Sequence, residues 1–100
     1  MDIAIDRDAA GTRLTPRGPL DGTTAVQLQE PLLAAIGEQP AALTLDFSAV
    51  PYISSAGMRV LVVAAKALQP RGLRLRLENV PAAVLQVLKM ANFTSFIDVA

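Results

Sequence analysis

The sequence contains neither cysteine nor histidine. Without cysteine the chain has no disulfide, no thiolate nucleophile and few of the usual structural zinc sites, and without histidine it lacks the commonest general base and metal ligand. A serine nucleophile would therefore depend on a lysine. In a helix, Ser55 and Lys66 would be separated by roughly 16 Å along the axis, too far for proton transfer. We expect no enzymatic activity, no cofactor and no metal site.

Motifs for phosphate binding and for carboxylate catalysis are also absent. The six glycines stand singly, so there is neither a Walker-type loop nor a dinucleotide fingerprint. Asp21 and Asp46 could be imagined as a catalytic pair, but isolated acids at the ends of loops and strands usually face water or cap a backbone. The composition favours a binding or regulatory domain over a catalyst.

The chain has no excess of charge of either sign and no long apolar run. Nine basic and nine acidic side chains cancel, so no long-range field attracts nucleic acid or an anionic membrane. No segment approaches the roughly 18 consecutive apolar residues of a membrane span, and the first residues do not resemble a secretion signal. We expect a cytoplasmic protein with no nucleic-acid partner and no direct membrane insertion.

What is present is enough for one compact domain over residues 1–100, since the chain is 52% hydrophobic. In the first half, alternation over residues 2–6 and 12–15 predicts a hairpin ended by Pro16 and Pro19. A helical stripe follows and stops near Gly37. Pro31 interrupts that stripe, so the helix either bends there or begins later.

The second half alternates strands with helices. Residues 42–47 and 73–77 alternate apolar with polar side chains and predict strands, whereas residues 56–68 are apolar nearly all round and predict a buried helix. A last helix follows Pro81 and ends at Asn92, and residues 96–99 favour a short final strand. The order β-β-α-β-α-β-α predicts an α/β fold, a mixed sheet of four to five strands with helices mainly on one face.

Ser54 and Ser55 stand at the start of the buried helix. Either hydroxyl could cap the helix by accepting a backbone N–H. A helix start also favours an anion, which makes the same position suitable for phosphorylation. The serine pair alone does not distinguish a cap from a phosphate acceptor.

Two segments give the pair a context: Gly18-Pro19-Leu20-Asp21-Gly22-Thr23-Thr24-Ala25, and residues 45–61, which include Leu45-Asp46-Phe47-Ser48 and Tyr52-Ile53-Ser54-Ser55-Ala56-Gly57-Met58. Over almost the whole chain the sequence resembles the STAS domain of bacterial anti-sigma factor antagonists. In that family the turn commonly reads Asp-Ser-Ser-Gly-Leu or Asp-Ser-Thr-Gly-Leu, and the serine after the aspartate is phosphorylated. Aligned on Gly57, Ser55 takes the acceptor position, and Ser54, Ala56 and Met58 replace the aspartate, the second hydroxyl and the leucine.

The resemblance implies a STAS-like partner switch in signal transduction that controls transcription. The unphosphorylated domain, a monomer or weak dimer, would bind an anti-sigma factor that is also a serine kinase with an ATP-binding fold. Phosphorylation at Ser55, or alternatively Ser54, would end that binding, and a serine phosphatase would restore it. The residues expected to face the partner are Asp21, Thr23, Ser54, Ser55, Gly57, Met58 and Arg59.

Two alternatives remain open. The missing aspartate and Ala56 favour a constitutive STAS interaction subunit of a transporter or lipid-transport assembly, which would use the fold without the switch. The domain could also be a sensor that binds a nucleotide or a lipid in its apolar core.

Overall fold

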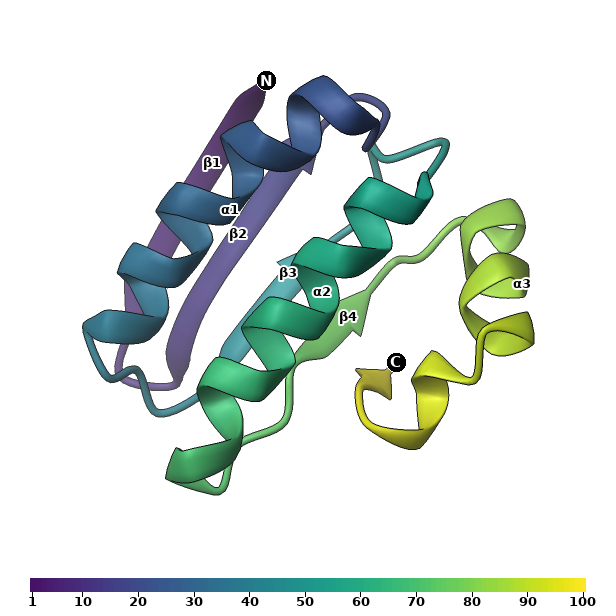
Figure 1. Ribbon diagram of the computed structural model, residues 1–100. Helices are drawn as coiled ribbons and strands as arrows, with labels where there is room; N and C mark the ends of the chain where they lie inside the picture. The colour runs from purple at the N-terminus through teal and green to yellow at the C-terminus, as the bar shows by residue number, and fades with distance from the viewer.

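A computed structural model describes residues 1–100 as a five-stranded sheet with three α-helices (Figure 1). The elements in chain order are β1 (Asp2–Asp8), β2 (Gly11–Arg17), α1 (Gly22–Gly37), β3 (Leu43–Asp46), α2 (Ser55–Leu68), the 3₁₀ turn η1 (Gln69–Arg71), β4 (Arg76–Glu78), α3 (Ala82–Met90), the 3₁₀ turn η2 (Phe93–Ser95) and β5 (Asp98–Val99). The strands lie in the order β1-β2-β3-β4-β5, with β1 antiparallel to β2 and every other pair parallel. The predicted α/β fold with a mixed sheet is confirmed.

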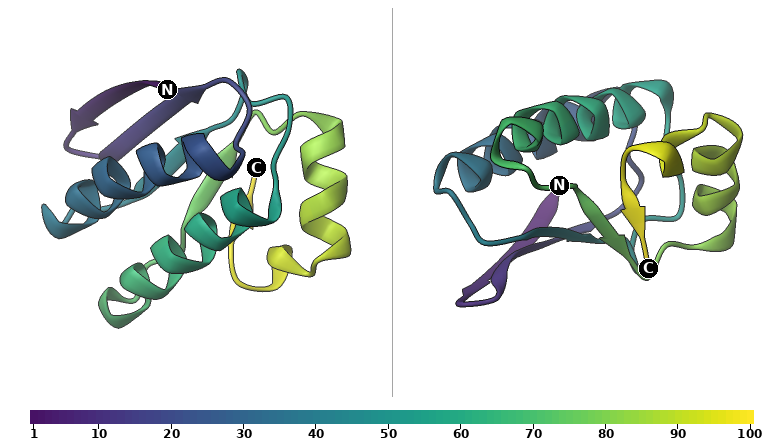
Figure 2. Two further views of the ribbon diagram at one scale, coloured as in Figure 1. Left: turned by 45° about the horizontal axis from the view of Figure 1, so that its top comes forward. Right: turned by 90° about the horizontal axis from the view of Figure 1, so that it is seen from below.

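Helices α1 and α2 pack side by side on one face of the sheet, and α3 stands beside the edge formed by β4 and β5 (Figure 2). The strand alternation produces this layering. Leu14, Leu45 and Leu77 are in register on neighbouring strands, and all three are fully buried beneath the helices. On each strand, the residues directly before and after these leucines point to the opposite, polar face of the sheet. No helix has both the length and the hydrophobicity needed to cross a bilayer.

The predicted strand over 73–77 is wrong in its first half, because β4 contains only Arg76–Glu78. The alternating pattern reflects burial of Leu75 and Leu77, and burial does not require a ladder partner. Strand β3 begins at Leu43, and its Thr44 already pairs with Arg76. Leu73 therefore has no strand residue of β3 beside it.

The structure decides two expectations that rested on prolines. Pro16 does not end the second strand, which continues to Arg17. The β2–β3 ladder stops at Leu14, so Pro16 is paired only with β1, an arrangement that a residue without an N–H tolerates. Pro31 lies inside a continuous α1 that begins at Gly22, which excludes a later helix start.

Candidate functional site at the amino end of helix α2

The segments that precede α1 and α2 are joined directly. Leu20 and Ile53 form an isolated parallel bridge. The Leu20 N–H donates to the Tyr52 carbonyl at 2.9 Å, and the Ser54 N–H donates to the Leu20 carbonyl at 2.8 Å. Both helices therefore begin at the same end of the molecule (Figure 1), and residues far apart in the sequence share one surface.

Asp21 is the N-cap of α1. Its carboxylate accepts the backbone N–H groups of Thr23 at 2.9 Å and Thr24 at 3.0 Å, while the Thr24 hydroxyl accepts the Asp21 N–H. The N–H groups of Thr24 and Thr23 hold the pKa of Asp21 below its usual value. Asp21 therefore carries a fixed negative charge at neutral pH, next to the start of α2.

Ser54 and Ser55 have different roles in the structure. Ser54 is the N-cap of α2, with extended backbone, and its Oγ accepts the Gly57 N–H at 3.2 Å. Ser55 is the first helical residue; it is exposed, and its hydroxyl makes no hydrogen bond. Serine caps a helix about as well as aspartate, so Ser54 caps α2 without a charge at the position where the resembling motif commonly has aspartate. The free hydroxyl belongs to Ser55.

Gly57 is buried beneath this turn and packs against the bridge that joins the two segments. A Cβ placed on Gly57 would lie 2.8 Å from Ile53 Cγ1 and 3.0 Å from Leu20 Cβ. The first turn of α2 can approach the bridge this closely only because residue 57 has no side chain. Gly57 thus acts at the site through packing.

The other residues expected to face a partner all reach the surface. Thr23 and Arg59 are exposed, and Asp21 and Met58 are half-buried. Sequence reasoning missed two apolar side chains at the same end of the molecule: Tyr52, 56% exposed, and Val26, 72% exposed. Tyr52 is the only tyrosine and lies two residues before the serine pair, which was the available signal, whereas Val26 had none.

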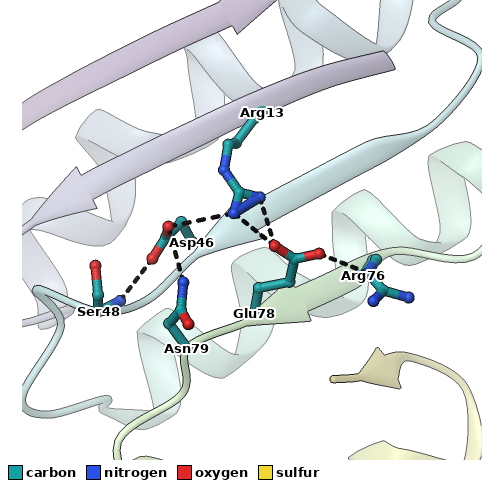
Figure 3. A network of polar contacts seen from close by, with 6 residues as sticks. All are labelled: Arg13, Asp46, Ser48, Arg76, Glu78 and Asn79. Atoms are coloured by element: carbon teal, nitrogen blue, oxygen red, sulfur yellow. Dashed lines mark hydrogen bonds and ion pairs between the residues drawn. The ribbon is translucent and has the colours of Figure 1, made fainter. Parts of the chain in front are cut away.

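Asp46 belongs to a separate network on the polar face of the sheet (Figure 3). Its carboxylate accepts the Ser48 N–H at 2.9 Å and the Asn79 amide at 3.1 Å, and lies 3.4 Å from Arg13 Nη2. Arg13 Nη1 also donates to Glu78 Oε1 at 2.7 Å. Asp21 and Asp46 thus have different hydrogen-bond partners and belong to separate networks. The structure does not group three or more histidine, cysteine, aspartate or glutamate side chains that could hold a metal ion.

Two carboxyl groups of this network also have lowered pKa values. Burial raises the pKa of Asp46, but the hydrogen bonds from Ser48 and Asn79 and the charge of Arg13 together outweigh it. The hydrogen bond from Arg76 lowers the pKa of Glu78, assisted by the charge of Arg13. The network therefore holds the loop after β3 most firmly when both carboxylates are charged.

These shifts predict an acid-dependent stability. A depressed pKa contributes stability above the unfolded-state value, here 3.8 for aspartate and 4.5 for glutamate, and that stability is lost as pH falls through the folded value. We expect urea unfolding to give nearly constant stability from pH 6 to 8, where no histidine titrates, and a steep fall below about pH 4. The Asp46→Asn variant should show a shallower acid fall, and the control Glu30→Gln an unchanged one. A broad loss of stability centred near pH 6 would contradict the assignment of the acid dependence to these carboxyl groups.

The family model for the STAS domain matches residues 3–100. This chain belongs to the STAS domain family. A protein of Bordetella bronchiseptica (strain RB50), provisionally named the anti-sigma factor antagonist BtrV, is 32% identical over 100 residues, which cover 100% of this chain and 86% of that protein.

Solved structures share the STAS fold. A provisionally named anti-sigma factor antagonist of Thermotoga maritima superposes with a TM-score of 0.89 at 18% identity, covering 97% of this chain and 84% of that one. Bacillus SpoIIAA in its phosphorylated form gives 0.75 at 15% identity, covering 99% and 91%. A sulfate transporter family protein of Wolinella succinogenes gives 0.72 at 25% identity, covering 83% and 67%. The fold is thus shared by anti-sigma factor antagonists and by a sulfate transporter family protein.

Proposed function

We propose that this chain is an anti-sigma factor antagonist that works by partner switching in the cytoplasm. When unphosphorylated it binds an anti-sigma factor that is also a serine kinase with an ATP-binding fold, and phosphorylation of Ser55 releases it. The observation that carries the proposal is the exposed Ser55 hydroxyl, which makes no hydrogen bond at the first position of α2. The similarity to BtrV and to SpoIIAA, a protein solved in a phosphorylated form, supports it.

Ser55 is the better acceptor of the two serines. The Ser54 oxygen already accepts the Gly57 N–H, so a phosphate there would disturb the cap. A phosphate on Ser55 would leave the cap intact and lie near the positive end of the helix dipole. The fold should therefore tolerate the modified state, and a serine phosphatase could reverse it.

The surface around Ser55 accounts for the difference in partner binding between the unphosphorylated and the phosphorylated domain. Tyr52 and Met58 offer apolar area to a partner, and Arg59 an exposed cation. A phosphate brings nearly two further negative charges beside Asp21, and burying them in an interface carries a desolvation penalty unless a cation receives them. A change of a few kcal/mol in the binding free energy is enough to shift the domain from mostly partner-bound to mostly free.

A second candidate is a constitutive STAS interaction subunit of a transporter or lipid-transport assembly. Ser54 in place of the family aspartate removes a charge beside the acceptor, and the likeness to the Wolinella protein provides a precedent for the fold in a transporter. In that case the same surface would bind its partner without a phosphorylation cycle.

Co-purification of the tagged chain from its own cells separates the two candidates. We expect wild type to retain a kinase with an ATP-binding fold, and Tyr52→Ala to retain at least about tenfold less, because an exposed aromatic at an interface commonly contributes 1–2 kcal/mol or more. Met90→Ala is the matched control, since Met90 is 80% exposed on α3, away from the site. Retention of transporter subunits instead of a kinase would reject the switch.

A further inference from the structure

A cavity of about 420 Å³ lies at the other end of α2, between this helix and the turn η2. Its apolar walls come from Val62, Ala65, Leu73, Phe93 and Phe96. The two phenylalanine rings are 4.9 Å apart and tilted by 48°. In Figure 1 the yellow C-terminal segment that carries them faces the lower half of α2. The volume falls within the range of small-molecule sites, roughly 300–1,000 Å³.

The rim of the cavity is positively charged. Lys66 lines it and forms no hydrogen bond or ion pair within the chain, in contrast to Arg74, whose Nε donates to Asp98 Oδ1 at 2.9 Å. No carboxylate is among the lining residues, and the remaining polar group is the Gln69 amide. The cavity therefore combines apolar walls with one cation that has no partner within the chain.

We propose that this cavity binds a single-chain carboxylate, a fatty acid of medium length. The hydrocarbon chain packs between the two phenylalanines and the short side chains of α2, and the carboxylate pairs with Lys66. One free ammonium matches one carboxylate, whereas a polyphosphate would need several more donors than the lining supplies. Lys66 lies roughly 16 Å along α2 from Ser55, so the ligand does not occupy the proposed partner surface.

Isothermal titration with decanoate, below its micelle concentration, tests the proposal on the intact chain. We expect a dissociation constant below about 100 µM. Butyrate should bind at least about a hundredfold more weakly, because it buries six fewer methylene groups. Decyltrimethylammonium, with an alkyl chain of nearly the same length and the opposite charge, should give no saturable heat. Absence of decanoate binding, or equal binding of the cationic amphiphile, would overturn the proposal.

Variants locate the ligand within the cavity. Lys66→Gln changes an exposed residue and should weaken decanoate binding about five- to tenfold, whereas Arg17→Gln, which removes an exposed arginine on β2, should leave it unchanged. Ala65→Phe should fill the cavity and abolish binding. An unchanged affinity in Lys66→Gln would refute the carboxylate contact. None of these measurements involves the kinase, so their outcome is independent of phosphorylation at Ser55.

Discussion

The Ser55→Ala variant is expected to incorporate no phosphate when incubated with the cognate kinase and ATP, while wild type gains one phosphate measurable by intact mass. The reason is that Ser55 has the free, exposed hydroxyl of the pair. The variant should remain bound to the kinase through repeated ATP additions. Ser55→Glu should bind at least about a hundredfold more weakly than wild type, equivalent to about 2.7 kcal/mol.

Ser54→Ala is the matched control for this experiment. It removes the cap hydrogen bond to the Gly57 N–H and should lower stability by about 1 kcal/mol, or the melting temperature by roughly 4–8 °C, while phosphate incorporation persists. Ser55→Ala removes no hydrogen bond and should melt within a few degrees of wild type. If Ser54→Ala abolished phosphorylation and Ser55→Ala did not, the acceptor would be Ser54.

Gly57→Ala is expected to have the largest effect on stability among the changes at the site. The new Cβ would lie 2.8 Å from Ile53 Cγ1 and 3.2 Å from the Leu20 carbonyl oxygen, and the backbone bridge leaves little room for either atom to move. Overpacking costs about 1–3 kcal/mol, and the better helix propensity of alanine recovers up to about 1 kcal/mol. Urea unfolding should show a net loss of about 1–2 kcal/mol.

Gly37→Ala provides the matched comparison. Gly37 is the last residue of α1, and a Cβ there would meet nothing within 4 Å. This variant should be as stable as wild type or more stable, by up to about 1 kcal/mol. If Gly57→Ala were as stable as Gly37→Ala or as wild type, residue 57 would have room for a side chain, and Gly57 would not be needed for packing against Ile53 and Leu20.

The sequence predicted the elements whose signal is local. Alternation in the first residues indicated the hairpin, and the uniformly apolar stretch before Pro70 indicated the buried helix α2. Where prediction and structure differ, the reason is pairing. The alternating pattern includes Leu73, yet the chain at Leu73 has no partner on β3, so β4 begins only at Arg76. The sequence predicted that Pro16 ends the strand. Proline, however, lacks only the N–H that would donate toward β3, so its pairing with β1 continues.

The sequence by itself determined the fold class, the absence of histidine and cysteine chemistry, and, through its resemblance to the family motif, the register that singles out Ser55. Which serine hydroxyl caps α2 and which stays free was decided only by the tertiary structure. The physical reason is that the Leu20–Ile53 bridge, with Gly57 packed against it, sets where α2 begins. Helix propensity cannot choose between adjacent serines, whereas a bridge between segments distant in the sequence can.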